Sequence, residues 1–262
     1  MFPYYHIFNL TFASYGTLIL IGLIFGGVVS YLLAKKYMPE IKLDVFLSFL
    51  FGALGVAIGG KLLYIIVSFP QIIQFRNSTS NTLQALQIII SSGFVFYGSL
   101  IGAILALFIY CKSFHVSIER ILYFLTPAIP LIQVFGRIGC FSVGCCYGVE
   151  SESFGYVFKR SPIAPNGVRL FPTQLLESIA CFIIFVIILI LFHKIHNGYR
   201  LISIYGILYS TFRFFIEFFR GDIYRGFIRI FSISQIISLL LLLVTIIYLL
   251  KSKNHLVIKP ND

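Results

Sequence analysis

Four polar residues interrupt a long apolar stretch of the sequence at helical spacing. The stretch runs from Leu201 to Phe219, and the polar residues are Tyr209, Arg213 and Glu217, with Arg220 directly after it. At about 100° per residue they fall within an arc of roughly 80° on one helical face. Ionisable side chains at membrane depth are costly and usually face a functional interior or a water-filled cavity. The pattern predicts a helix with one polar stripe, whose arginines could bind an anion while Glu217 orients them.

A second candidate arginine, Arg137, lies in a glycine-rich segment that follows two prolines. Four glycines in thirteen residues suggest a backbone that is broken or tightly turned at membrane depth, where freed N–H groups could bind an anion. These glycines are Gly136, Gly139, Gly144 and Gly148. Each arginine also has a structural alternative. Arg137 could cap its span or snorkel, and Arg213 with Glu217 could form an ion pair that only fixes helix orientation.

The composition is that of an integral membrane protein. Hydrophobic residues make up 59% and charged residues 11% of the 262 residues, which a soluble domain could carry only with large exposed apolar patches. About 20 apolar residues cross the hydrocarbon as a helix, so an all-α, polytopic protein with about seven transmembrane helices is predicted. The long runs disfavour a β-barrel, whose strands use roughly 10-residue alternating segments. The predicted spans are 13–34, 43–68, 83–110, 118–138, 173–193, 201–219 and 230–250.

The distribution of Lys and Arg predicts an orientation. The segment before the first span has no basic region and no small-residue cleavage site, so no removable signal peptide is expected. With the N-terminus outside, the inside loops hold 8 Lys and 2 Arg, and the outside loops hold 1 Lys and 6 Arg. This split fits a topology signal on one side and an anion-handling surface on the other. Alternatively, the arginines between 213 and 229 only contact lipid phosphates.

The loops complete a single transmembrane domain over residues 1–262. Residues 140–170 are rich in Gly, Ser, Pro and Asn and are predicted to form an ordered loop outside the membrane, with room for short strands. Residues 251–262 are predicted to be a cytoplasmic tail. Glycines in the first two spans are interpreted as contacts that let helices approach closely, because small residues serve that purpose in lipid.

The segment from Gly136 to Gly148 resembles the signature of the bacterial prolipoprotein diacylglyceryl transferases, in a form that contains cysteines. The family's seven spans and outward N-terminus agree with the pattern of apolar runs and charges. Further matches follow the family's order over some 220 residues: Tyr15-Gly16, Gly59 to Tyr64, Gly93 to Gly102, Pro172 to Glu177, Tyr209 to Asp222, and Ser234-Gln235.

The resemblance implies transfer of the diacylglyceryl group from phosphatidylglycerol to the thiol of a lipobox cysteine in a preprolipoprotein, with release of glycerol phosphate. It places the family's essential arginines on Arg137 and Arg213, which would stabilise the charge that develops on the departing phosphate. A central lipid-binding cavity in the bacterial inner membrane is expected, with no cofactor and no nucleic acid. The other expected substrate-binding residues are Tyr15, Tyr64, Gly98, Gly136, Gly139, Tyr209, Glu217 and Arg220.

Several positions depart from the family's pattern. Cys140, Val143 and Cys145 stand where most members have Asn, Asn and Glu, and Lys61 and Phe171 replace Arg and His. Tyr97 stands where many members carry His and is the expected catalytic partner of the arginines. A tyrosine with a pKa near 10 is a poor base, so Tyr97 either binds the substrate by hydrogen bonding or acts as a base with a strongly lowered pKa. Alternatively, the acceptor thiol ionises near the arginines without a dedicated base.

Three cysteines, Cys140, Cys145 and Cys146, are grouped near the predicted outer face. They are interpreted as packing residues, and a disulfide from Cys140 to one of the other two is an alternative. No metal is expected, because no His or second cysteine pair completes a tetrahedral shell. A thiol-based acyl or redox enzyme is a further alternative. Cys111 and Cys181 are interpreted as small apolar fillers.

Two other functions remain open from the sequence. The altered signature fits a paralogue that transfers a phospholipid-derived group to a different thiol or a small acceptor. A non-enzymatic phospholipid carrier is the second, and its cavity would cross both leaflets. The residues by themselves indicate a membrane protein with an arginine-lined site for an anionic ligand.

Overall fold

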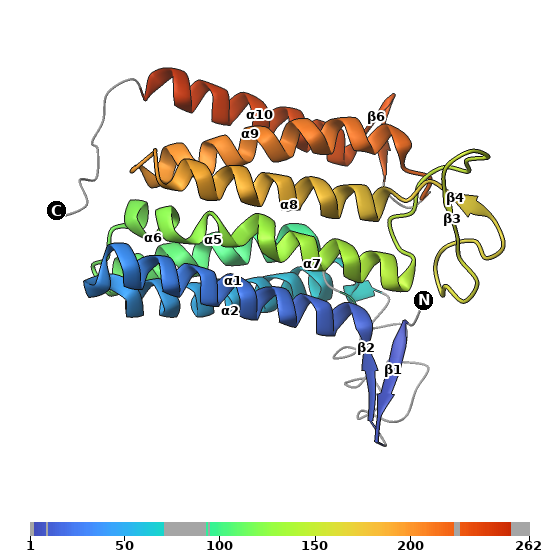
Figure 1. Cartoon of the computed structure of the whole chain (residues 1–262), viewed down its shortest axis with the longest axis horizontal. Helices are drawn as coiled ribbons and strands as arrows, with labels where there is room; N and C mark the ends of the chain where they lie inside the picture. Colours follow the sequence, from blue (N-terminus) through green and yellow to red (C-terminus); the bar gives the residue numbers. More distant parts are fainter. Residues whose placement is uncertain (1–2, 9, 71–92, 94, 223–225, 253–262) are drawn as a thin grey trace. The chain divides into compact units, whose positions relative to one another are not determined.

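The computed structural model describes residues 3–8, 10–70, 93, 95–222 and 226–252 (Figure 1). The chain divides into two compact units, one of Met1–Glu40 with Leu122–Asp262 and one of Ile41–Ile121. We call them the large unit and the small unit. Helices dominate both units, which confirms the all-α prediction, and the strands form only two-stranded pairs in the described part of the chain.

The large unit is a row of helices in which each packs against the next. The contacts run from α1 to α7, then to α8, α9 and α10, as Figure 1 shows from blue to red. The elements of this unit are β1 (Tyr4–Ile7), β2 (Leu10–Ala13), α1 (Ser14–Tyr37), α7 (Ala128–Val143), β3 (Tyr156–Val157), β4 (Arg169–Leu170), α8 (Thr173–Phe192), α9 (Gly198–Ile216), the 3-10 turn η2 (Glu217–Phe219), β5 (Phe227–Ile228), β6 (Phe231–Ser232) and α10 (Ile233–Lys251).

The small unit is built on two helices, α2 (Lys42–Val67) and α5 (Phe96–Ser113). A Cβ on Gly55 would lie 2.3 Å from the carbonyl oxygen of Gly102, and a Cβ on Gly59 would lie 2.3 Å from that of Gly98. The two backbones therefore touch along a glycine seam, as the glycine spacing predicted for α2. The chain passes from one unit to the other within two elements, the 3-10 turn η1 (Pro39–Ile41) and helix α6 (Ile118–Leu125).

Six helical segments in the described part of the chain are long and apolar enough to cross a membrane, and α6 with α7 makes a seventh if the bent pair is one span. The predicted span 118–138 is that pair, bent by 44°. Pro127 stands at the break, and its missing N–H ends the hydrogen-bond ladder of α6. The predicted span 83–110 corresponds to α5, and the predicted start of that span lies outside the described residues.

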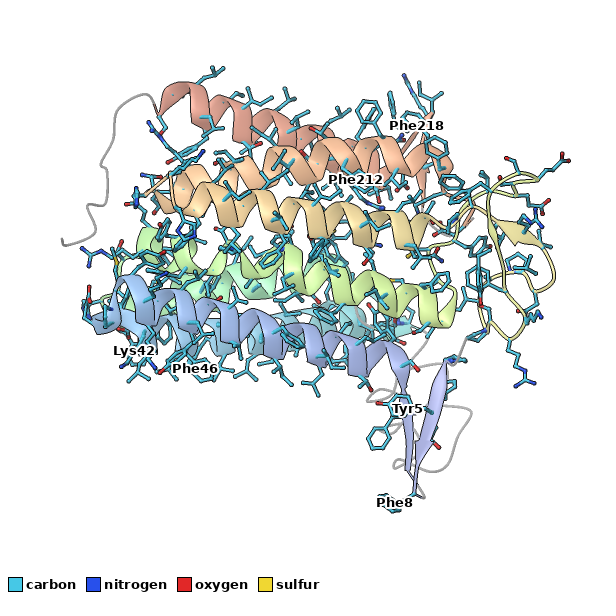
Figure 2. All side chains as sticks on the ribbon, in the orientation of Figure 1. Tyr5, Phe8, Lys42, Phe46, Phe212 and Phe218 are labelled. Atoms are coloured by element: carbon cyan, nitrogen blue, oxygen red, sulfur yellow. The ribbon has the colours of Figure 1, made fainter. Side chains whose placement is uncertain are left out.

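The outer surfaces of the helices are apolar, as contact with lipid requires. Large hydrophobic side chains along the spans are exposed, among them Phe46 in α2 and Phe218 after α9, which Figure 2 shows as sticks. Such side chains need not be buried inside the protein, because the surrounding lipid is itself hydrocarbon. The chain is therefore a multi-pass membrane protein.

The glycine-rich segment differs in part from its prediction. Helix α7 continues through Gly136 and Gly139, so the backbone is not broken there and its N–H groups remain in the helix. The tight turn comes at Gly144, which adopts φ +78° at the end of α7. A side chain there would be strained, because positive φ favours glycine.

The polar stripe also differs in its last member. The α-helical geometry of α9 ends at Ile216 and tightens to the 3-10 turn η2, so Arg220 lies beyond the helix with extended backbone. Arg220 instead forms an isolated antiparallel bridge with Gly148, in the segment after α7. This bridge connects the chain after α9 to the loop of residues 140–170.

The predicted outer loop is ordered by its own small core. Strands β3 and β4 pair antiparallel, with Tyr156 opposite Leu170. Phe158, Ala164 and Leu170 are buried together, and aromatic side chains pack on them. The short strands expected for residues 140–170 are therefore present, at one end of the large unit (Figure 1).

Candidate active site

A buried carboxylate joins the two arginines that the sequence singled out. Glu177, early in α8, is 1% exposed. Arg213 of α9 donates a 2.7 Å hydrogen bond from Nη1 to Oε1 of Glu177. Nε of Arg137 in α7 lies 2.7 Å from Oε2, but the N–H is not aligned with that oxygen, so this contact is an ion pair without a hydrogen bond. Two guanidinium groups from separate membrane-spanning helices thus converge on one carboxylate.

Glu217 extends the cluster toward the end of α9. Its Oε2 lies 2.9 Å from Nη2 of Arg213 and 3.6 Å from Nη1 of Arg220. Arg220 donates from Nε to Oδ1 of Asp222 at 2.8 Å, and its Nη2 contacts the other carboxylate oxygen. Arg213 also donates from Nη2 to Oγ of Ser234 at 3.3 Å, which links the cluster to α10. Four helices or their ends therefore contribute to one polar network.

The network is balanced in charge and nearly closed to solvent. Three guanidinium groups face three carboxylates, those of Glu177, Glu217 and Asp222. Arg213, Glu217 and Arg220 are all buried. Burial lowers the pKa of Arg220, but the hydrogen bonds to Asp222 outweigh it, so the pKa lies above its ordinary value and the guanidinium stays charged. Removing one partner of such a buried ion pair strongly destabilises the fold, because the other charge is left buried and uncompensated.

Arg137 is the member of the cluster that remains open to a ligand. Its side chain is 18% exposed, against 10% for that of Arg213. Only its Nε takes part in an ion pair, and within the described residues Nη1 and Nη2 have no partner. Because a guanidinium offers five N–H donors in a planar fork, Arg137 can still hold an anionic oxygen pair with its outer edge.

Local structure positions Glu177 one turn into α8. Thr173 donates from Oγ1 to the carbonyl of Cys146 at 2.7 Å, and Gln174 donates from Nε2 to that of Cys145 at 2.8 Å. The start of α8 is thereby fixed to the loop that follows α7. On the other side, Ser232 and Gln235 form a capping box that begins α10 and places Ser234 beside Arg213.

Tyr15 and Gly139 lie together at the same end of the large unit. A Cβ on Gly139 would come within 3.1 Å of Cδ2 of Tyr15, so the glycine makes room for the tyrosine ring. Tyr15 is within electrostatic range of Arg137 and is 41% exposed. A Cβ on Gly136 would meet no described side chain or neighbouring element within 4 Å, so the backbone of α7 beside Arg137 faces open space.

Tyr209 lies one turn before Arg213 on α9. Its ring stacks on that of Tyr205, with centroids 5.9 Å apart and planes 15° apart. Tyr205 in turn donates from its hydroxyl to Oε1 of Gln133 at 2.9 Å. Tyr209 is within electrostatic range of Arg137. The large unit therefore brings together Tyr15, Gly136, Arg137, Gly139, Tyr209, Arg213, Glu217 and Arg220.

The remaining predicted residues belong to the small unit. The ring of Tyr64 in α2 lies 5.3 Å from Nζ of Lys61. Gly98 in α5 is part of the seam with Gly59, and Tyr97 is 39% exposed and packs edge-on against Phe96. Backbone N–H of Val95 donates to the carbonyl of Gly60 at 3.2 Å, which anchors the start of α5. Their roles toward the arginine cluster remain predictions.

The three cysteines at and after the end of α7 meet at one point. The Sγ atoms of Cys140, Cys145 and Cys146 all lie within 4.8 Å of one another, and all three thiols are free. The packing interpretation did not anticipate this convergence, which the turn at Gly144 produces. Buried Cys111 and Cys181 lie inside α5 and α8, as the sequence predicted.

Glu177 and Asp222 are the residues of the cluster that were not named as site residues from the sequence. Glu177 is the charged residue of helix α8, and intramembrane ionisable residues are functional candidates by default. The same rule that selected Arg213 would have selected it. Asp222 follows Arg220 by two residues, a separation that gives no helical signal.

The geometry defines a class of protein: a polytopic membrane protein with a buried arginine and carboxylate cluster where several spans end, open to an anionic group at Arg137. The family model of prolipoprotein diacylglyceryl transferase matches residues 4–251 of this chain. The chain belongs to that family.

Curated relatives cover almost the full chain. A phosphatidylglycerol–prolipoprotein diacylglyceryl transferase of Clostridium tetani is 34% identical over 92% of this chain and 94% of its own length. A protein of Clostridium perfringens with the same name, numbered 2, is 33% identical over 90% of each chain. The corresponding transferase of Finegoldia magna is 32% identical over 97% of this chain and 96% of its own.

Proposed function

We propose that this chain transfers the diacylglyceryl group of phosphatidylglycerol to the cysteine thiol of a preprolipoprotein lipobox and releases glycerol phosphate. Membership of the family and near-complete coverage of relatives with that name support the reaction. The observation that carries the proposal is the convergence of Arg137 and Arg213 on Glu177, since two preorganised guanidinium groups beside an open edge suit a phosphate.

The chemistry assigns a part to each group. The acceptor sulfur bonds to the glyceryl carbon, and the bond from that carbon to the phosphate oxygen breaks. The phosphate leaves with one more negative charge, and the thiol proton passes to a base or to solvent. The outer edge of Arg137 binds the phosphate oxygens and stabilises that charge. Arg213, held by Glu177 and Glu217, keeps the positive field fixed so that little reorganisation is needed.

The hydroxyls of Tyr15 and Tyr209 are proposed donors to the headgroup, because both lie within electrostatic range of Arg137. Glu177 Oε2, which accepts no hydrogen bond within the described chain, can accept one from a headgroup hydroxyl. Tyr97, Tyr64 and Gly98 are proposed as further substrate-binding or catalytic residues, and a central cavity is proposed for the acyl chains. Tyr97 would act as a hydrogen-bond partner or base toward the acceptor thiol.

We place the protein in the bacterial inner membrane with its N-terminus outside, as a single domain over residues 1–262. Residues 140–170 would then be extracytoplasmic and residues 251–262 cytoplasmic. The cluster would face the side on which lipobox segments emerge. The excess of Lys at the other end of the helices supports this orientation.

The test is a reconstituted reaction. Purified protein is incubated with phosphatidylglycerol and a lipobox peptide, and the peptide is analysed by mass spectrometry. We expect a diacylglyceryl adduct on the cysteine and an equal amount of glycerol phosphate, with no adduct on a peptide that carries Ser instead of Cys. Release of glycerol phosphate without a peptide adduct would indicate a different acceptor. Binding of phosphatidylglycerol with neither product would indicate a carrier.

A further inference from the structure

We propose that Cys140, Cys145 and Cys146 form a three-thiolate binding site for a soft metal cation, with Zn²⁺ as the reference ion. The site adjoins the arginine and carboxylate cluster but shares no residue with it. It does not depend on the proposed transferase reaction. The sequence favours packing for these cysteines and offers no fourth protein ligand for a metal. The structure changes that view because three thiols converge rather than two.

The distances between the thiols suit a metal better than a disulfide. All three Sγ atoms lie within 4.8 Å of one another. Zinc and thiolate sulfur bond at about 2.3 Å, which puts ligand sulfurs about 3.8–4.0 Å apart in tetrahedral or trigonal geometry. Closing the cluster on an ion thus needs shifts of about 1 Å or less, within the reach of side-chain rotation. A disulfide needs a contact of about 2.05 Å and leaves one thiol over.

The backbone holds the ligand segment in place. The N–H groups of Gly144 and Cys145 both donate to the carbonyl of Cys140, at 2.9 and 3.1 Å, and Gly144 and Cys146 have positive φ. This turn folds the last two cysteines back over the first. The carbonyls of Cys145 and Cys146 accept hydrogen bonds from the first residues of α8. Supporting bonds of this kind orient metal ligands and raise affinity.

Charge and access fit a soft cation. Three thiolates with a divalent ion carry one net negative charge, and the guanidinium groups of Arg137 and Arg220 are within electrostatic range of Cys146. Cys140 is buried, whereas Cys145 and Cys146 are partly exposed and leave a path for the ion. Within the described residues no carboxylate or imidazole joins the group, so the side chains offer sulfur ligands and favour a soft ion over a hard one such as Mg²⁺. Water would occupy the fourth tetrahedral position.

The first test measures metal binding directly. The full-length protein is purified in detergent, reduced, stripped of metal and titrated with Co²⁺ and Zn²⁺. We expect one ion per chain, with a thiolate-to-cobalt charge-transfer band that Zn²⁺ displaces. Cys140→Ser, Cys145→Ser and Cys146→Ser should each abolish the band, whereas the matched controls Cys111→Ser and Cys181→Ser should keep it. A band unchanged in the three outer variants, or absent from the reduced wild type, would overturn the proposal.

A second measurement uses the native chain, so that a misfolded variant cannot decide the outcome. Thiol alkylation by a maleimide is followed by mass spectrometry with and without Zn²⁺. We expect Zn²⁺ to slow alkylation of Cys145 and Cys146 at least about 10-fold, because metal-bound thiolate is shielded. Equal alkylation rates in both conditions would refute the site. The site would also be refuted if two of the three cysteines formed a disulfide without added oxidant and the reduced protein took up no metal.

Discussion

At the residue scale, the site is a chain of alternating charges rather than a pair of free arginines. Glu177 lies between Arg137 and Arg213, and Glu217 lies between Arg213 and Arg220. Arg213 is held by both carboxylates, whereas Nη1 and Nη2 of Arg137 have no partner in the part of the chain that the structure describes. The two arginines should therefore differ in role: Arg137 contacts the anionic group, and Arg213 fixes the position of the carboxylates and the local field.

Replacing either central arginine by lysine should cost activity without removing charge. Lys keeps the positive charge but loses the planar fork, so Arg137→Lys and Arg213→Lys should each lower the rate of diacylglyceryl transfer by about 10²-fold or more. The measurement is the initial rate of peptide modification. Arg200→Lys is the control, because Arg200 lies at the opposite end of α9 and bonds to the carbonyl of Ser252. Full activity in both site variants would rule out the proposed role of the two arginines in stabilising the phosphate.

The shared carboxylate should matter for stability as well as for catalysis. In Glu177→Gln the guanidinium groups of Arg137 and Arg213 lose their common counter-charge and repel each other. We expect a loss of about 3–5 kcal/mol in the free energy of unfolding, measured by denaturation in detergent without substrate. Glu152→Gln is the control, since that side chain is exposed in the loop of residues 140–170. Equal stability of Glu177→Gln and wild type would mean that the cluster contributes nothing to the fold.

At the element scale, apolar runs predicted the spans well and local backbone geometry poorly. Spacing at about 100° per residue placed Tyr209, Arg213 and Glu217 together, and it failed for Arg220 because the last turn of α9 tightens and the chain then extends. The clustered glycines suggested a break in α7 that occurs only at Gly144. Glycine signals a need for space or for positive φ, and the sequence does not distinguish these two needs.

The β1–β2 hairpin was not anticipated. Strands β1 and β2 pair antiparallel with Tyr4 opposite Ala13, and Phe8 after β1 is 97% exposed. The sequence YYHIFNLTFA is rich in aromatic and β-branched residues, but it has no Asn-Gly or Asp-Gly turn that would have marked a hairpin. Tyr5 stacks on Phe12 across the strands, with ring centroids 5.7 Å apart, which is the cross-strand contact that supports the pair.

The glycine seam of the small unit gives a prediction with an internal control. In Gly55→Ala the new methyl would meet the carbonyl oxygen of Gly102 at 2.3 Å, so the helices must separate. We expect a cost of about 1–3 kcal/mol from this overpacking. In Gly52→Ala the methyl would meet only the Leu107 side chain, at 3.5 Å, and a gain of up to about 1 kcal/mol in helix propensity is available. Thermal denaturation of both variants in detergent checks the difference, and equal melting temperatures would contradict the seam.

At the scale of the whole molecule, the large unit gathers its functional groups at one end. The start of α1, the end of α7, the start of α8, the end of α9 and the start of α10 meet there, beside the ordered loop of β3 and β4 (Figure 1). Alternation of helix direction produces this convergence, and five segments far apart in sequence can then supply one site. The order of apolar runs predicts the alternation, but only the folded chain shows that Glu177 joins Arg137 to Arg213.

The side of the membrane that the site faces follows from the predicted orientation, and this prediction can be tested in cells. A protease recognition sequence is inserted after Ser153, in the exposed outer loop, or after Lys251, at the end of α10. With the predicted orientation, external protease should cut the first insertion in intact spheroplasts and the second only after permeabilisation, because Lys-rich ends stay inside. Permeabilised cells, where both must be cut, are the control. Cleavage after Lys251 in intact spheroplasts would show that the topology is the reverse of the predicted one. The arginine cluster would then lie on the cytoplasmic side, away from the emerging lipobox segments.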